Sequence, residues 1–152
     1  MIPDEFVVLL AEDDEHDIVA TKRAWRALGL RSALHIVNDG EQCLDYLFRR
    51  GRYAPPGQAP RPHLLLLDIN MPRLGGIDTL RQIRASAPYR TLPVVMLTTS
   101  KAEEDQIKSY ASGATAYVVK PLGFDNFSAA IKAIHDFWNL AEAQKEYHAP
   151  AK

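Results

Sequence analysis

The sequence of 152 residues predicts an α/β fold, a doubly wound parallel sheet of five strands with helices on both faces. Two observations predict this fold. Short apolar runs alternate with longer stretches in which apolar residues recur at helical spacing, a pattern typical of strand–helix–strand units. The run Leu64–Leu67 is apolar throughout, as expected of a strand that helices cover on both faces.

The expected elements follow one another without an internal repeat or a domain boundary, so residues 1–152 are predicted to form a single domain. Strands are expected at 6–11, 33–37, 64–67, 92–98 and 116–119, and helices at 16–28, 40–50, 77–87, 102–112 and 124–147. Asp39 is suited to cap the second helix, and Gly51 is expected to end it. The prolines of Tyr53–Pro62 exclude a helix or a central strand and predict a long loop.

The composition restricts the functional class. With 47% hydrophobic and 24% charged residues, the chain has the usual make-up of a globular domain. A net charge of -1 argues against a nucleic-acid partner, and no apolar run is long enough to span a membrane. The N-terminus lacks the features of a signal peptide, and a single cysteine, Cys43, excludes an internal disulfide. We therefore expect a cytoplasmic protein.

Polar side chains stand at the ends of four of the predicted strands. They are Glu12 and Asp13 after the first, Asp68 after the third, Thr98 at the end of the fourth and Lys120 after the fifth. Because the strands are parallel, these ends meet at the edge where α/β sheets bind ligands. Asp68 alone could simply begin a turn, and the others have similar structural explanations. Their joint placement favours a functional site.

The residue types suit phosphoryl transfer. Clustered carboxylates repel one another, and a Mg²⁺ ion with hard oxygen ligands relieves that repulsion. Lys120 and the hydroxyl of Thr98 are suited to stabilise the oxygens of a transferred phosphoryl group. Asp68 then remains as a carboxylate nucleophile. The sequence thus predicts a Mg²⁺ site and phosphorylation of Asp68.

Four motifs resemble those of the receiver domains of two-component response regulators, over nearly the whole chain. They are LLAEDD (9–14), LLLLDINMPRLGG (64–76), VVMLTTS (94–100) and AYVVKPL (116–122). The resemblance implies a flavodoxin-like receiver fold with strand order 2-1-3-4-5. It also implies that a histidine kinase phosphorylates Asp68 and that the signal passes on through changed protein–protein contacts. Such a domain is a phosphoacceptor rather than an enzyme, because any phosphatase activity acts on itself.

The resemblance assigns roles to single residues around the metal. Asp13 would bind Mg²⁺ directly, and Glu12 would act through a water molecule. Asp68 and the backbone carbonyl of Asn70 would complete the ligand set.

Further roles follow for the phosphoryl group. Thr98 and Lys120 would contact it, and Tyr117 would be the aromatic switch. The peptide bond between Lys120 and Pro121 would be cis.

A narrower resemblance is to the stand-alone, phytochrome-associated response regulators. It lies in the segments DGEQCLDYLFRRGRYAPP, LTTSKAEEDQIKSYASGATAYVVKP and FDNFSAAIKAIHDFWNLA, whereas Ala114–Ala116 departs from the pattern. It implies a bacteriophytochrome histidine kinase as the phosphodonor and an unknown downstream protein as the target. Because the chain ends soon after the last predicted helix, no output domain is expected.

The last predicted helix is a candidate for self-association. Phe137, Trp138 and Leu140 extend its apolar surface beyond the length needed to cover the sheet. The phytochrome-associated regulators that the chain resembles are homodimers, which implies the same here. The alternative is that these side chains fold back onto their own domain.

Two other functions are alternatives to a phosphoacceptor. A phosphatase of the haloacid dehalogenase type also uses a strand-end aspartate, but it needs a second acid where this chain has Asn70, which cannot exchange protons. A degenerate receiver that only binds partners would be expected to lack part of the acidic pair, Thr98 or Lys120, and none of these is missing.

Overall fold

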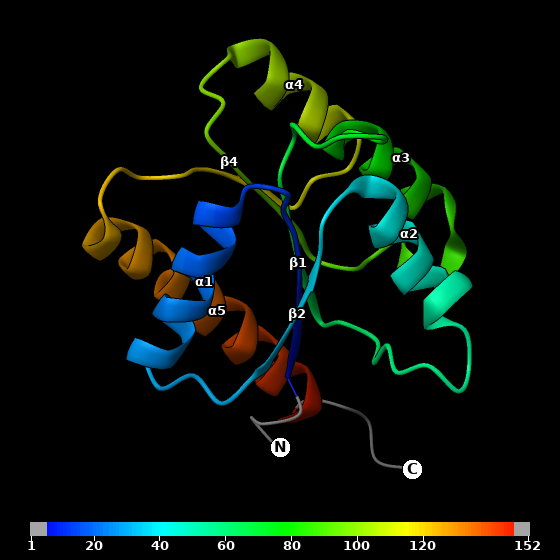
Figure 1. Ribbon diagram of the computed structural model, residues 1–152, viewed down its shortest axis with the longest axis horizontal. Helices are drawn as coiled ribbons and strands as arrows, with labels where there is room; N and C mark the ends of the chain where they lie inside the picture. Colours follow the sequence, from blue (N-terminus) through cyan, green and yellow to red (C-terminus); the bar gives the residue numbers. More distant parts are fainter. Residues whose placement is uncertain (1–5, 148–152) are drawn as a thin grey trace.

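Five apolar strands form a parallel sheet at the centre of the molecule (Figure 1). The computed structural model describes residues 6–147, so the expectations about the N-terminal residues and the chain end lie outside the described residues. The strands are β1 (Val7–Ala11), β2 (Ala33–Val37), β3 (Leu64–Leu67), β4 (Val94–Thr98) and β5 (Ala116–Val119). Their order is β2-β1-β3-β4-β5, and every neighbouring pair is parallel. The predicted fold class and strand order are confirmed.

Helices cover both faces of this sheet. The helices are α1 (Glu15–Ala27), α2 (Gly40–Phe48), α3 (Gly76–Ala85), α4 (Glu103–Ala111) and α5 (Phe124–Tyr147). Helices α1 and α5 lie on one face, and α2, α3 and α4 lie on the other (Figure 1). The bounds agree with the predicted ones within two residues.

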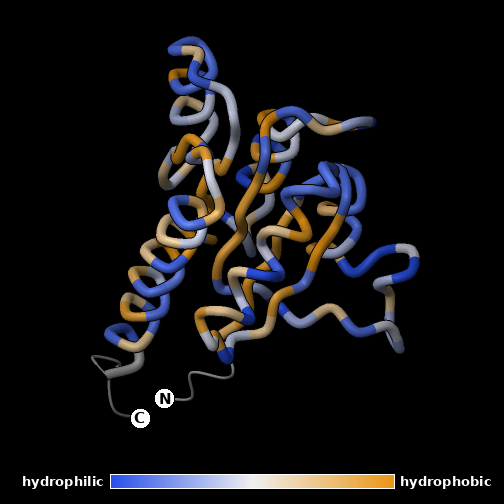
Figure 2. Tube along the Cα trace, turned by 60° about the vertical axis from the view of Figure 1, so that its left-hand side comes forward, coloured by the Kyte–Doolittle hydropathy of each residue, from blue (hydrophilic) through white to orange (hydrophobic). Residues whose placement is uncertain are grey.

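The two faces of the sheet carry separate hydrophobic cores. In β1, Leu9 and Ala11 belong to the core beneath α2 and α3, whereas Val8 and Leu10 belong to the core beneath α1 and α5. All residues of β1, β3 and β4 are buried, whereas most residues of the edge strands β2 and β5 are only half-buried. Figure 2 shows the strands as mostly apolar stretches, whereas apolar and hydrophilic residues alternate along the helices. This double covering explains why the central strands are unbroken apolar runs.

Helix α2 ends earlier than predicted. Its C-cap is Arg49, which has a left-handed backbone with φ of 56°, and Gly51 instead begins a short 3-10 helix over Gly51–Tyr53. The Arg49 side chain donates hydrogen bonds to the carbonyls of Tyr53 (2.7 Å) and Gly57 (2.6 Å). These bonds offset the cost of a left-handed backbone at a residue that is not glycine. Because Arg49 is the C-cap, the prediction that Gly51 ends the helix is wrong.

The proline-rich loop after α2 is confirmed, and it lies against the domain. The hydroxyl of Tyr46 donates to the carbonyl of Pro60 (2.7 Å), and Ala59 is buried in the core. The Arg61 guanidinium donates to the carbonyl of Pro88 (2.5 Å) and stacks over the ring of Tyr89.

The length of α5 divides its apolar residues into two groups. Phe127 and Ile131, in the first half of the helix, are buried. Phe137 and Leu140 are exposed by 61% and 60%, whereas Trp138 is partly buried against the core that α1 and α5 share. None of the helices within residues 6–147 is long and apolar enough to cross a membrane.

Candidate functional site

Three carboxylates meet at the carboxyl ends of β1 and β3. The two strands are neighbours, with Ala11 paired to Leu67, so the residues that follow each strand lie side by side. Oxygens of Glu12, Asp13 and Asp68 all lie within 4.8 Å of one another. The structure therefore brings the predicted acidic pair next to the predicted phosphoacceptor.

The members of this acidic cluster differ in exposure. Glu12 and Asp68 are buried, and Asp13 is exposed. Asn70, the other predicted metal ligand, is exposed and lies two residues beyond Asp68, between β3 and α3. One oxygen of Asp68 accepts a hydrogen bond from the amide of Ile69 (2.7 Å), which orients the carboxylate.

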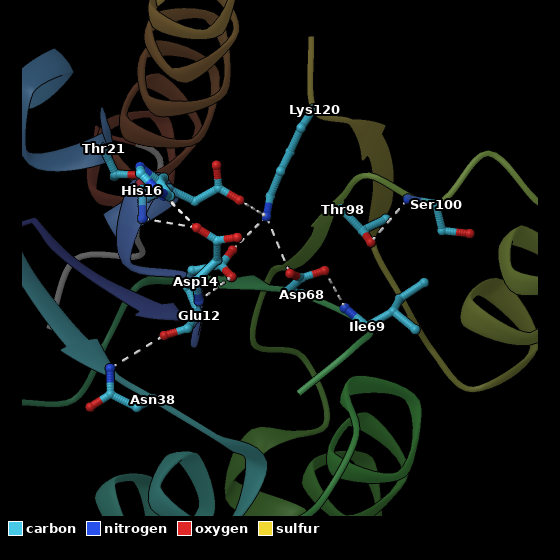
Figure 3. A network of polar contacts seen from close by, with 11 residues as sticks. Glu12, Asp14, His16, Thr21, Asn38, Asp68, Ile69, Thr98, Ser100 and Lys120 are labelled. Carbon is cyan, nitrogen blue, oxygen red and sulfur yellow. Dashed lines mark hydrogen bonds and ion pairs between the residues drawn. The ribbon is translucent and has the colours of Figure 1, made fainter. Parts of the chain in front are cut away.

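Lys120 reaches the acidic cluster from the end of β5 (Figure 3). Its ammonium group contacts Glu12 Oε1 at 2.5 Å and Asp68 Oδ2 at 3.2 Å. A third contact, to Asp17 Oδ2 at 2.7 Å, was not predicted from the sequence. The available signal was the position of Asp17 in the first turn of the helix that follows β1, where a side chain stays close to the strand end.

Burial and charge act in opposite directions on these groups. Burial raises the pKa of Glu12 to about 7, although the hydrogen bond from Lys120 opposes the shift, and the nearby charge of Asp68 adds to it. Burial lowers the pKa of Lys120, but hydrogen bonds to Asp17 and Glu12 and the charge of Asp68 outweigh burial and raise that pKa overall. Lys120 is therefore charged and offsets part of the negative charge of the acidic cluster.

The donor set fits a divalent cation. Three carboxylates within 4.8 Å, two of them buried, offer hard oxygen ligands of the kind that Mg²⁺ and Mn²⁺ prefer. Their mutual repulsion, which contributes to the raised pKa of Glu12, is the strain that a bound cation would relieve. Asp13 is the carboxylate of the three that is open to solvent.

Thr98 and Tyr117 are connected through the segment after β4. Thr98 is fully buried at the strand end, and its hydroxyl accepts a hydrogen bond from the amide of Ser100 (3.3 Å). The hydroxyl of Tyr117 donates to the carbonyl of Ser100 (3.0 Å). The Ser100 hydroxyl in turn donates to Asp105 of α4 (2.6 Å), so the two predicted switch residues share one loop residue with α4.

The prediction of a cis peptide bond between Lys120 and Pro121 is wrong. Among residues 6–147, the cis peptide bond joins Pro55 and Pro56, and the bond that follows Lys120 is trans. For a bond before proline the two isomers differ by only about 0.5–1 kcal/mol, so the residue pair itself does not decide between them. The correction leaves the Lys120 side chain at the site.

Strand order and strand-end residues together correspond to one family. Residues 8–132 match the response regulator receiver domain. The chain belongs to this family. Glu12, Asp13, Asp68, Thr98 and Lys120 all lie within the matched residues.

Several solved structures similar to this chain are response regulators connected with phytochromes or with red light signaling. The phosphorylated cyanobacterial phytochrome response regulator RcpA has 31% sequence identity and a TM-score of 0.82, over 88% of this chain and 94% of RcpA. RPA3017, from red light signaling of R. palustris, has 38% identity and a TM-score of 0.81, over 88% of this chain and 93% of RPA3017.

A third relative carries a metal ion. Response regulator Rcp1 of Synechocystis is 32% identical over 87% of this chain and 88% of its own length. The crystal structure of its Mn²⁺-bound form has a TM-score of 0.79 to this chain. A divalent cation in a similar receiver agrees with the oxygen ligands of the acidic cluster.

Proposed function

We propose that this receiver domain accepts a phosphoryl group on Asp68 from a histidine kinase in a reaction that requires Mg²⁺, and then signals through changed contacts with another protein. One observation carries the proposal. Asp68 follows the central strand β3, with an oxygen 3.2 Å from the ammonium group of Lys120 and within 4.8 Å of oxygens of Glu12 and Asp13. A carboxylate nucleophile, a cation and a metal-binding set thus meet in one place.

Each residue has a separate task in the proposed transfer. A carboxylate oxygen of Asp68 attacks the phosphorus of a phosphohistidine. The phosphorus–nitrogen bond breaks, and the imidazole leaves with the electron pair. Lys120 neutralises charge on the phosphoryl oxygens, and the Ile69 amide holds the second oxygen of Asp68. When bound through Glu12, Asp13, Asp68 and the Asn70 carbonyl, Mg²⁺ supplies further positive charge for those oxygens.

The proposed output begins at Thr98. A phosphoryl group on Asp68 presents new acceptor oxygens, and the Thr98 hydroxyl is a donor at the neighbouring strand end. Turning that hydroxyl toward the new anion would end its role as acceptor for the Ser100 amide. Because Ser100 also contacts Tyr117 and Asp105, the change would reach β5 and α4. This coupling is a two-state shift that the phosphoryl group biases.

The proposed phosphodonor is a phytochrome histidine kinase. Support comes from RcpA, which is a phytochrome response regulator, and from RPA3017, which acts in red light signaling. Both cover most of this chain at 31% and 38% identity. A homodimer through α5 is also proposed, because Phe137 and Leu140 expose large apolar side chains near the end of that helix.

The assignment of Asp68 is tested with acetyl phosphate as a small phosphodonor. With Mg²⁺ present, the wild-type chain is expected to gain the mass of one phosphoryl group, and Asp68→Asn is expected to gain none. Asp78→Asn, which removes an exposed carboxylate from α3, is the matched control and should label normally. Full labelling of Asp68→Asn would contradict the proposal.

A further inference from the structure

We infer that Asp17 is a positioning residue for Lys120, holding its ammonium group beside Asp68 when a cation occupies the acidic cluster. The inference rests on the proposed phosphorylation of Asp68 and assigns a role to a residue outside the four motifs.

The ammonium group of Lys120 has three carboxylate partners and three N–H donors. Its distances are 2.5 Å to Glu12, 2.7 Å to Asp17 and 3.2 Å to Asp68. The Lys120 side chain is buried, with 5% of its surface exposed, so water cannot replace a lost partner fully. The contact to Asp17 is therefore one of the two shorter bonds that hold the ammonium group in place.

Asp17 differs from the other two partners in its relation to the metal site. Glu12 and Asp68 belong to the group of carboxylates that is close enough to share a cation, and Asp17 does not. A divalent ion in that cluster would draw on Glu12 and Asp68 and would repel the ammonium group. Among the described partners of Lys120, Asp17 is then the one whose charge the cation leaves available.

The backbone of Asp17 is held firmly enough to serve as an anchor. Asp14 caps α1, and its side chain accepts hydrogen bonds from the amides of His16 (2.8 Å) and Asp17 (3.2 Å). The carbonyl of Asp17 accepts a bond from the Thr21 hydroxyl (2.7 Å), and Figure 3 shows these capping residues beside the acidic cluster. The Asp17 side chain is 29% exposed, so it can be changed without opening a core.

The first test compares phosphorylation rates with acetyl phosphate at saturating Mg²⁺. Asp17→Asn keeps an acceptor oxygen but loses the charge, and it should slow labelling about tenfold, the size expected for losing one bond between charged groups. Asp17→Glu, which keeps the charge, should recover most of the rate. Glu15→Gln is the matched control, since it removes a charge from the same helical turn without touching Lys120.

The second test is a double-mutant cycle with Lys120→Gln. If Asp17 acts through Lys120, Asp17→Asn will cause little further loss of rate in the Lys120→Gln background. An equal loss in both backgrounds would overturn the inference, because Asp17 would then act as a general negative charge. So would a loss of Mg²⁺ affinity in Asp17→Asn as large as its loss of rate, because Asp17 would then act on the metal ion.

The two proposals fail in different ways. Labelling of Asp68→Asn would overturn the phosphoacceptor assignment whatever the result at Asp17. Normal labelling of Asp17→Asn alongside unlabelled Asp68→Asn would overturn the positioning role alone. Thermal unfolding of each variant without Mg²⁺ shows whether a slow rate reflects a damaged fold, and Asp17→Glu provides a second folded variant for the comparison.

Discussion

The three carboxylates of the acidic cluster differ in how many hydrogen-bond and ion-pair partners already occupy their oxygens. Glu12 is buried, with one oxygen on Lys120 and the other accepting from the amide of Asp14 (3.0 Å). Asp68 is held by Lys120 and Ile69. Asp13, in contrast, makes no hydrogen bond or ion pair with a side chain or amide elsewhere in residues 6–147, and it is exposed. An incoming cation would therefore compete with no described side-chain or amide partner for the oxygens of Asp13.

Removing Asp13 is expected to weaken Mg²⁺ binding strongly. Asp13→Ala takes away a proposed direct oxygen ligand, and since even outer residues of metal sites change affinity about 10–100-fold, we expect a loss of at least about tenfold. Isothermal titration calorimetry with MgCl₂ measures the dissociation constant, with Glu15→Gln as control for the loss of a nearby charge. Unchanged affinity in Asp13→Ala would place the metal elsewhere.

The single cysteine is expected to be unreactive in the folded protein. Cys43 is completely buried in the core beneath α2 and α3, and burial raises the pKa of its thiol to about 12. At about pH 8 the nucleophilic thiolate is therefore scarce in the native state, whereas in urea the pKa returns toward its usual value near 8.5. Iodoacetamide should modify the unfolded chain readily and the native chain very slowly. Rapid, complete modification of the native protein would refute this prediction.

At the scale of elements, the turn from β3 into α3 decides how Asp68 is presented. The amide of Gly76 donates to the carbonyl of Ile69 (2.8 Å), which closes the loop that contains Asn70.

A second connection joins this loop to α2. Arg73, with a left-handed backbone, pairs with the buried Asp39 at 2.8 Å, and the Gly40 amide donates to the Leu74 carbonyl (3.1 Å).

A side chain at position 76 is expected to disturb this turn. A Cβ on Gly76 would lie 2.0 Å from the carbonyl oxygen of Asp68, so the backbone of one partner must move. We expect Gly76→Ala to lower the free energy of unfolding by about 2 kcal/mol, within the range for overpacked sites, and to slow labelling of Asp68. Urea unfolding and acetyl phosphate labelling measure the two effects.

The neighbouring glycine provides the control. A Cβ on Gly75 would lie 3.3 Å from the Ile69 carbonyl oxygen, a contact that needs a much smaller shift than the one at Gly76. Gly75 is also the N-cap of α3, a position that serine favours. Gly75→Ser should therefore keep both stability and labelling. If Gly76→Ala behaves like Gly75→Ser, the close approach does not constrain the site.

At the scale of the whole molecule, α5 carries the exposed apolar side chains on which the proposed homodimer depends. Its first half covers the sheet together with α1, and its second half presents Phe137 and Leu140 to solvent. Trp138 packs edge-on against Phe137, with ring centroids 4.7 Å apart, and also contacts the core. Phe137 and Leu140 are therefore better sites than Trp138 for testing an interface without damaging the monomer.

Sedimentation at micromolar concentration tests the proposed homodimer. We expect a dimeric wild type and a largely monomeric Phe137→Asp/Leu140→Asp variant, because two buried charges would oppose association. Val19→Asp, which places the same charge on an exposed apolar position of α1, should leave the dimer intact. A wild type that stays monomeric with and without a beryllofluoride phosphoryl mimic would contradict the homodimer.

Local patterns in the sequence were sufficient for much of the fold and for the candidate site. Apolar runs such as Leu64–Leu67 predicted strands correctly because a strand buried on both faces has no polar position. The predicted cluster of Glu12, Asp13 and Asp68 follows from strand ends that share one edge of a parallel sheet. The first inference depends on the pattern of apolar residues within one strand. The second depends on the alternation of strands and helices along the chain, which predicts parallel strands.

Other features depended on contacts between residues far apart in the chain, so the tertiary structure alone decided them. Arg49 ends α2 because loop carbonyls bind its side chain, and Trp138 differs from Phe137 because only one of them faces the core. Asp17 became a partner of Lys120 only when α1 was placed against the end of β5, 103 residues away in sequence. Which strands form and which acids follow them could be predicted because burial patterns are local. Which side chains Lys120 touches could not be predicted, because that contact requires the packed elements.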